Sequence, residues 1–251
     1  MRGQLEGTVA LVSGAASGIG AATAQLLVAR GARVIVADID EAGAVSTAKH
    51  IGESAEAWRL DVRSSREWDE VVAHCVDSYG SLDLLVNSAA CLRDAPLLEV
   101  SEAELRNHLD VNLIGCFLGL RAAASAMLRK RHGTIINIAS VSGAIAHRNR
   151  GAYAISKWAA RGLVKTAALE WAEAGIRVCS VLPGAIDTPM ARRAREMDPT
   201  VSLKDVPFSS APLGRFGQPE EVAGLIAYLA SSEAGYITGA EFVIDGGFLL
   251  T

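Results

Sequence analysis

The stretch TVALVSGAASGIG (residues 8–20) joins a short apolar run to a glycine-rich turn. Gly14, Gly18 and Gly20 mark the turn, and a helical pattern begins at about residue 18. Glycine lets a backbone turn tightly and lie close to a ligand, and a helix N-terminus offers free N–H groups to a pyrophosphate. The stretch therefore predicts a strand, turn and helix that bind a dinucleotide. A glycine-rich turn that binds nothing is the alternative.

Apolar runs and helical patterns alternate along the rest of the chain. The runs are ARVIVAD, AEAWRLD, LDLLVNSA, GTIINIAS, IRVCSVLPG and AEFVIDGG, and helices are expected near 18–30, 41–50, 64–79, within 101–131, and near 151–174 and 218–231. Continuous rather than alternating apolar strands are typical of a parallel sheet covered by helices on both faces. We expect one doubly wound Rossmann-type α/β domain over residues 1–251, with about seven parallel strands. Its ligands should bind beyond the carboxyl ends of the strands, where the winding reverses.

Composition favours a small-molecule partner. The 251 residues are 50% hydrophobic and 21% charged, enough to bury a large core, as one α/β domain or two small ones. A net charge of −4 argues against nucleic acid or an anionic membrane as the main partner. The N-terminal sequence fits neither a signal peptide nor a membrane span, so we expect a cytoplasmic protein. No metal site is expected, because the cysteines lack CxxC spacing and the histidines lack ligand patterns.

Asp38 ends the second apolar run, eighteen residues after Gly20. An acidic residue near this spacing accepts hydrogen bonds from the adenosine ribose and repels a 2′-phosphate. Neither Ser17 nor Ile39 supplies a compensating positive charge. The position therefore favours NAD(H) over NADP(H), with an ordinary loop carboxylate as the alternative.

The stretch GAYAISKWAA (residues 151–160) places Tyr153 and Lys157 four residues apart. On a helix these positions share a face, so both side chains can point into one cleft. A phenol is a poor proton acceptor at neutral pH, but an ammonium group and a positive nicotinamide ring both favour its ionised form. The pair predicts an acid/base site, unless the tyrosine merely anchors the helix and the lysine reaches solvent.

Taken in order along the whole chain, these motifs resemble the short-chain dehydrogenase/reductase family in its compact form. The likeness includes SGAASGIG, LDV, NSAA at 87–90, DVNLIG, NIAS, YAISK and PGAIDT. Two stretches depart from the family pattern. Residues 87–90 read Asn-Ser-Ala-Ala where the family has Asn-Asn-Ala-Gly, and Ser13 replaces a threonine while keeping the hydroxyl.

The resemblance implies a catalytic tetrad of Asn112, Ser140, Tyr153 and Lys157. Tyr153 would take the hydroxyl proton in oxidation and return it in reduction, while hydride moves between nicotinamide and the carbinol carbon of a secondary alcohol. Ser140 would bond the substrate oxygen, and Asn112 would hold a water that relays the proton from Lys157. The cofactor-binding residues implied are Ser13, Gly14, Ser17, Gly18, Ile19, Gly20, Asp38, Ile39, Asp61, Val62, Asn87, Ser88, Ala89, Tyr153, Lys157, Pro183, Gly184, Ile186 and Thr188.

By resemblance, the substrate is held by residues 91–98, residues 141–150 and a lid near 185–214. These segments offer a largely apolar lining of Leu92, Ser142, His147 and Met190, together with Ala144, Ile145 and Phe208. A moderately hydrophobic alcohol or ketone fits such a lining. The arginines of ARRARE and HRNR either clamp an anionic group or belong to a solvated helix face.

Several alternatives stay open. A reductase of imines or activated double bonds would use the same scaffold, as would an epimerase that uses NAD transiently, although the chain has little room for the substrate domain of the family's epimerases. A catalytically silent NAD(H)-binding regulator would keep the glycine turn and Asp38 without needing the tetrad. By resemblance we also expect a homotetramer, paired through the helices of 101–131 and 151–174 and through the last helix with AEFVIDGGF. The physiological substrate, stereochemistry and direction do not follow from these residues.

Overall fold

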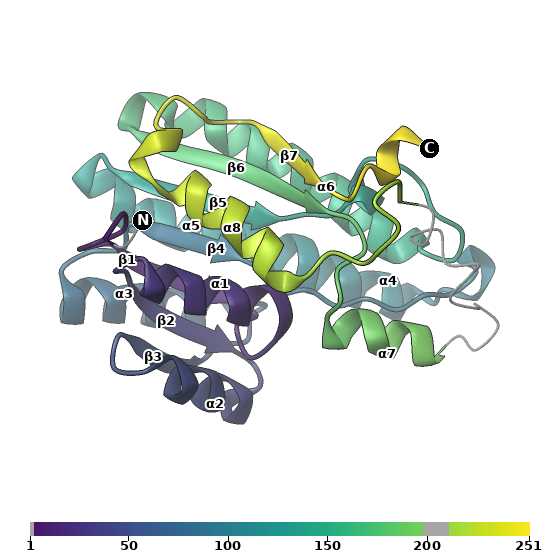
Figure 1. Cartoon of the computed structure of the whole chain (residues 1–251), viewed down its shortest axis with the longest axis horizontal. Helices are drawn as coiled ribbons and strands as arrows, with labels where there is room; N and C mark the ends of the chain where they lie inside the picture. Colours follow the sequence, from purple (N-terminus) through teal and green to yellow (C-terminus); the bar gives the residue numbers. More distant parts are fainter. Residues whose placement is uncertain (1–2, 198–210) are drawn as a thin grey trace.

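The computed structural model describes residues 3–197 and 211–251, and its strands and helices alternate as expected (Figure 1). In order they are β1 (Val9–Ser13), α1 (Gly18–Ala29), β2 (Arg33–Asp38), α2 (Glu41–Ile51), β3 (Ala55–Arg59), α3 (Ser65–Tyr79), β4 (Leu84–Asn87), α4 (Glu102–Leu109), α5 (Gly115–Lys130), β5 (Gly133–Ile138), α6 (Gly151–Trp171), β6 (Ile176–Pro183), α7 (Pro189–Met197), α8 (Pro219–Ala230) and β7 (Glu241–Ile244).

The seven strands form one parallel sheet in the order β3-β2-β1-β4-β5-β6-β7. β1 pairs with both β2 and β4, so that Val12 lies between Val36 and Val86. The chain winds from β1 toward β3 on one side and from β4 toward β7 on the other. The winding therefore reverses between β1 and β4, where an open α/β sheet binds its ligands. The expected doubly wound Rossmann-type fold is confirmed.

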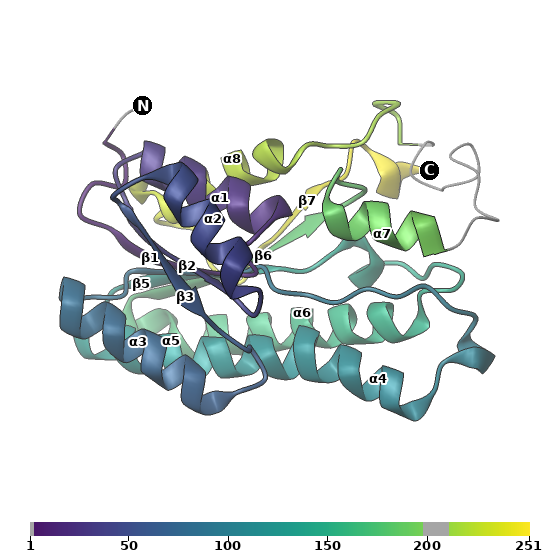
Figure 2. The ribbon, with the colours of Figure 1, turned by 90° about the horizontal axis from the view of Figure 1, so that it is seen from below.

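Helices cover both faces of the sheet (Figure 2). α1, α2 and α8 lie on one face, while α3, α5 and α6 lie on the other with α4 extending beyond the sheet. Successive strand residues point to opposite faces. Leu11 and Ile35 are buried in the cluster under α3, α5 and α6, and Val12 and Val36 are buried in the cluster under α1 and α8. The continuous apolar runs therefore supply buried side chains to both faces of the sheet.

Capping residues set several helix boundaries. Ser64 accepts a hydrogen bond from the Glu67 N–H (3.2 Å) at the start of α3, and Ser101 accepts one from Glu104 N–H (3.2 Å) at the start of α4. Gly80 ends α3 in the left-handed conformation. These local signals explain why the helix limits expected from the sequence agree closely with those observed.

The long helix expected within residues 101–131 contains a π-helix. Asp110–Ile114 adopts this wider turn between α4 and α5. The combined stretch Glu102–Lys130 has the length and hydropathy of a membrane span, but 56% of its apolar window is buried inside the fold, as in a core helix. Its apolar side chains, including Leu120 and Met127, pack under the sheet.

Candidate active site

A cavity of about 600 Å³ opens at the carboxyl ends of the strands. The segments that follow β1, β2, β3, β4, β5 and β6 all contribute to its wall, together with α6 and α7. Most of the residues expected to hold cofactor and substrate line it, namely Gly14, Ser17, Gly18, Ile19, Asp38, Ile39, Asp61, Val62, Ser88, Ala89, Leu92, Ser140, Tyr153, Lys157, Pro183, Gly184, Ile186, Thr188 and Met190. The motifs converge at the reversal point of the sheet.

The glycine turn at one end of the cavity fits a dinucleotide. Gly14 has φ +68°, and a Cβ there would lie 2.6 Å from the backbone nitrogen of Ala89. A Cβ on Gly20 would collide with the Gly14 carbonyl oxygen. Ser17 precedes α1 but its side chain makes no capping bond. The first N–H groups of α1 are therefore left for a ligand, beside a backbone that no side chain obstructs.

Asp38 is fixed between the glycine turn and α2. Its Oδ2 accepts a hydrogen bond from the Ala16 N–H (3.0 Å), and its Oδ1 accepts one from the Asp40 N–H (3.0 Å). Asp40 in turn caps α2 by accepting from the Gly43 N–H (3.0 Å). Two carboxylates thus stand at this end of the cavity, where Asp38 and Asp40 both line the wall.

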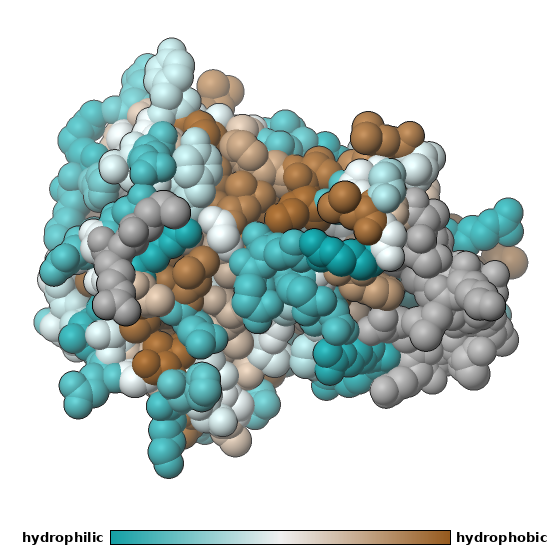
Figure 3. All heavy atoms as spheres, viewed as in Figure 1, coloured by the Kyte–Doolittle hydropathy of each residue, from teal (hydrophilic) through white to brown (hydrophobic). Residues whose placement is uncertain are grey.

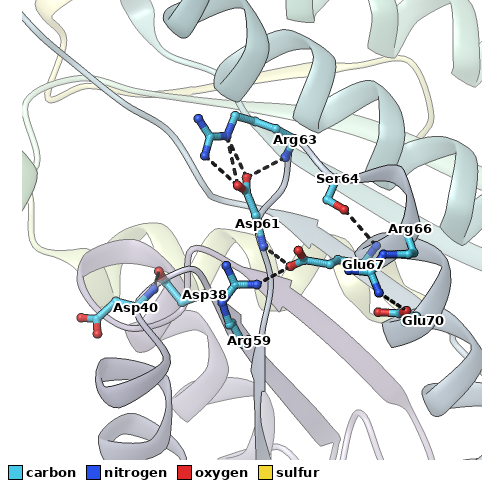
Figure 4. A network of polar contacts seen from close by, with 9 residues as sticks. All are labelled: Asp38, Asp40, Arg59, Asp61, Arg63, Ser64, Arg66, Glu67 and Glu70. Atoms are coloured by element: carbon cyan, nitrogen blue, oxygen red, sulfur yellow. Dashed lines mark hydrogen bonds and ion pairs between the residues drawn. The ribbon is translucent and has the colours of Figure 1, made fainter.

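A polar network holds the loop after β3, across from Asp38 (Figure 4). Arg63 donates from Nε and Nη2 to the two Asp61 oxygens (2.9 and 2.6 Å). These hydrogen bonds hold the pKa of the Asp61 carboxyl below its usual range. Glu67 accepts from the Asp61 N–H (2.8 Å) and from Arg59 (2.9 Å). Hydrogen bonds therefore connect the cavity wall at Asp61 and Arg63 to α3, and Arg63 is a wall residue that the sequence analysis missed.

Tyr153, Lys157 and Ser140 meet at the other end of the cavity. Lys157 is only 3% exposed, and its Nζ donates to the Ile138 carbonyl (2.8 Å) and lies 5.7 Å from the centre of the Tyr153 ring. Ser140 follows β5 and accepts a hydrogen bond on Oγ from the Ser142 N–H (3.1 Å). An acid/base pair and a hydroxyl group thus face the same space.

Asn112 lies behind the wall rather than on it. It occupies the π-helix and is buried. Its Nδ2 donates to the Cys91 carbonyl (3.0 Å) and to Ser156 Oγ (2.9 Å), and its Oδ1 accepts from the Cys91 N–H (2.8 Å). Ser156 Oγ donates to the Tyr153 carbonyl (2.7 Å). The Asn112 amide therefore ties the segment after β4 to the first turns of α6.

Other expected residues also lie off the wall. Ser13, Gly20 and Asn87 lie behind it, supporting the residues that line it.

The expectation that Ser142 and His147 line the substrate space is not met. Ser142 is fully buried, because its N–H bonds Ser140 Oγ in a 3₁₀ turn (Val141–Gly143) that points its side chain inward. The His147 ring stacks on Phe248, with ring centroids 5.6 Å apart. Burial, with the positive charge of Arg150, lowers the pKa of His147, so its imidazole is neutral at pH 7. Phe208 lies outside the described residues, as does part of the expected lid.

The wall contains further residues that the sequence analysis did not name one by one, although Cys91, Arg150, Ala185, Ala191 and Arg193 fall within the segments expected to hold substrate. They are Ala16, Asp40, Leu60, Arg63, Ala90, Cys91, Asn107, Val111, Ile138, Ala139, Arg150, Ala185, Ala191, Arg193 and Phe216. Arg150 pairs with Asp94 through its Nε (3.1 Å) and Nη2 (3.3 Å). Arg150 belongs to HRNR and Arg193 to ARRARE, so one arginine from each cluster reaches the cavity.

Comparison with known proteins agrees with this geometry. A family model described as enoyl-(acyl carrier protein) reductase matches residues 14–249. The chain belongs to the short-chain dehydrogenase/reductase family. This short-chain dehydrogenase/reductase is 41% identical over 247 residues to the 3-alpha-(or 20-beta)-hydroxysteroid dehydrogenase of Mycobacterium bovis, covering 98% of this chain and 91% of the relative.

Two more proteins extend the comparison. The trans-4-hydroxycyclohexanecarboxylate dehydrogenase of Sinomonas cyclohexanicum is 40% identical over 248 residues, covering 95% of this chain and 92% of the relative. The crystal structure of gox2181 superimposes with a TM-score of 0.93 at 34% identity, covering 98% of this chain and 97% of the other. Members of the family use nicotinamide cofactors, and the relatives support oxidoreduction between alcohols and ketones as the general chemistry of this short-chain dehydrogenase/reductase.

Proposed function

We propose that the protein is an NAD-dependent oxidoreductase that interconverts a secondary alcohol and a ketone. The observation that carries the proposal is the convergence of Ser140, Tyr153 and Lys157 at one end of a cavity whose other end holds the glycine turn and Asp38. An NAD(H)-binding regulator would need only the second end. The tetrad assignment, including Asn112, is part of this proposal.

The cofactor is held by the glycine turn, by Asp38 and by the segments after β4 and β6. When bound, the nicotinamide supplies or accepts the hydride. Ser140 Oγ accepts the Ser142 N–H, which leaves its own proton available to donate to the substrate oxygen. Tyr153 exchanges the proton of that oxygen, and the buried Lys157 ammonium offsets the negative charge left on the phenol. Asn112 keeps α6 in register with the segment after β4 through Ser156 and Cys91.

The substrate is best described as a ring-bearing secondary alcohol or its ketone. Leu92, Val111, Met190 and Phe216 give the cavity an apolar wall, and both enzymes compared above are named for alcohols of ring-bearing compounds. Arg150 and Arg193 lie on the same wall, so an anionic group on the ring would also be accommodated.

The test is the absorbance of reduced nicotinamide, with NAD or NADP and a panel of alcohols. The panel contains cyclohexanol, trans-4-hydroxycyclohexanecarboxylate, a 3-hydroxysteroid and an acyclic 2-alkanol, with the matching ketones run in reverse. We expect turnover of ring alcohols with a preference for NAD. Saturable NADH binding without turnover of any alcohol or ketone would instead favour the silent regulator, and turnover of only imines or activated double bonds would favour the alternative reductase.

The protein is further proposed to be a cytoplasmic homotetramer. On α5 and α6, Phe117 and Trp158 are 42% and 50% exposed. Figure 3 shows hydrophobic side chains gathered over α8 and β7, where Val243 is 47% exposed. These two faces match the two expected to pair.

Light scattering is expected to give four times the chain mass of 26.3 kDa at micromolar concentration. Phe117→Glu places a charge on the α5 face and should leave dimers that pair through α8 and β7. A wild-type protein with the mass of one chain would refute the tetramer.

A further inference from the structure

Arg161 joins three elements around the catalytic end of the cavity. It lies on α6 one helical turn after Lys157. Its Nε and Nη2 donate to the two carboxylate oxygens of Glu241, both at 2.7 Å, and its Nη1 donates to the carbonyl of Gly143. Glu241 is the first residue of β7, and Gly143 ends the 3₁₀ turn that Ser140 begins. The side chain therefore links α6, the last strand and the turn of the catalytic serine.

The turn lies directly against the backbone of α6. A Cβ on Gly143 would be 3.0 Å from the carbonyl carbon and oxygen of Lys157. Inside the turn, the Gly143 N–H donates to the Ser140 carbonyl (2.9 Å), and the Ser142 N–H donates to Ser140 Oγ. Because these bonds connect the two ends of a short turn, fixing the Gly143 carbonyl also fixes the Ser140 hydroxyl.

The ion pair between Arg161 and Glu241 is largely buried and remains charged at neutral pH. The side chains of Arg161 and Glu241 are only 19% and 18% exposed. The hydrogen bonds of Arg161 hold the pKa of the Glu241 carboxyl below its usual range, so both groups are ionised at neutral pH. The guanidinium also lies over the Trp158 ring, 5.2 Å from its centre. Two parallel bonds to one carboxylate set its plane, which leaves the third nitrogen aimed at Gly143.

Lys165 is the matched control for the hydrogen bond between Arg161 and the Gly143 carbonyl. Its Nζ lies 3.6 Å from Glu241 Oε2, on the same helix one turn further along. Lys165 thus shares the Glu241 carboxylate with Arg161, but among the described residues only Arg161 donates to the Gly143 carbonyl.

We propose that Arg161, anchored by Glu241, is a positioning residue that holds the turn after Ser140 and thereby sets the Ser140 hydroxyl relative to Tyr153 and Lys157. This inference rests on the role given to Ser140 under the proposed function. Arg161 does not line the cavity, so it acts through Ser140 and not by touching substrate or cofactor.

A double-mutant cycle tests the proposal in the full-length enzyme. Arg161→Gln should lower kcat about 10- to 100-fold, as for a catalytic group moved by a fraction of an ångström to an ångström, and leave the Kd for NADH within about twofold. In the Ser140→Ala background the same substitution should change kcat by no more than about twofold, because the group it positions is gone. Lys165→Gln should leave kcat unchanged in both backgrounds. An equal loss of kcat with and without Ser140 would overturn the proposal.

Amide hydrogen exchange of residues 141–145 gives a second readout that needs no turnover. Exchange there should be faster in Arg161→Gln than in wild type and unchanged in Lys165→Gln. Arg161→Lys, which can reach Glu241 or Gly143 but not form both contacts, should give intermediate exchange and kcat, and it replaces Arg161→Gln if that variant does not fold. If wild-type protein turns over no alcohol or ketone, the proposed function fails by itself. Unchanged exchange in the folded arginine variant overturns the positioning role in either case.

Discussion

Tyr153→Phe is expected to lower kcat about a thousandfold while NADH binds with unchanged affinity. The substitution removes one oxygen and keeps the ring that packs at the start of α6. The Tyr153 hydroxyl makes no hydrogen bond to any described residue, so the fold loses no contact. What is lost is the group that exchanges a proton with the substrate, and general acid–base catalysis contributes roughly 10²- to 10⁴-fold. Steady-state and single-turnover absorbance assays measure the loss, and fluorescence titration measures NADH binding.

Tyr236→Phe is the matched control for this experiment. Tyr236 is fully exposed and does not line the cavity, so removing its phenol oxygen should change neither kcat nor NADH affinity. Turnover of Tyr153→Phe at the wild-type rate would show that another group moves the proton. Loss of NADH binding in that variant would point to a distorted site rather than to a missing acid.

Asp38→Asn is expected to shift the preference between NAD and NADP, measured as the ratio of kcat/KM values, about a hundredfold toward NADP. The asparagine keeps the size of the side chain and one acceptor oxygen for the Ala16 or Asp40 N–H. It removes the negative charge that would face a 2′-phosphate, and two like charges in contact cost several kcal/mol, on the order estimated for interfaces. Parallel titrations with both cofactors measure the shift.

Asp40→Asn separates the role of Asp38 from the general charge of this end of the cavity. Asp40 also lines the wall, but its Oδ1 is directed to the N-terminus of α2, where it accepts from the Gly43 N–H. We expect a much smaller shift in cofactor preference. An unchanged ratio in Asp38→Asn would remove Asp38 from the ribose site, and equal shifts in both variants would mean that only net charge matters.

The sequence was sufficient to predict the sheet, because its signals are local and repeated. Most strands are apolar runs, and several of the helices that follow them begin at a capping residue, such as Asp40 before α2, Ser64 before α3 and Ser101 before α4. The glycine turn is also a local signal. So is the four-residue spacing of Tyr153 and Lys157, which places both side chains on one face of a helix. Several of the residues next to a strand end, among them Gly14, Asp38 and Ser140, accordingly line the cavity.

Contacts between distant segments could not be predicted in this way. Arg161 and Glu241 are 80 positions apart, and no pattern in either segment indicates that the two side chains form an ion pair. Ser142 was expected to face substrate because its segment follows β5, but it lies in the 3₁₀ turn that begins after Ser140 and is fully buried there. A role for Asn112 in the proton relay was expected from the resemblance, whereas the use of its amide to hold Cys91 depends on a loop that lies beside it only in the folded chain.

The π-helix at Asp110–Ile114 places a constraint on the number of residues between α4 and α5. It amounts to one extra residue within an otherwise α-helical stretch. Deleting a single residue there would close the wide turn into a regular α-helical turn and would displace the residues of the turn itself, among them Asn112. Asn112, whose Oδ1 accepts from the Cys91 N–H (2.8 Å) and whose Nδ2 donates to the Cys91 carbonyl (3.0 Å), would then no longer hold the loop after β4. A one-codon deletion in this segment would therefore detach an active-site wall from its scaffold.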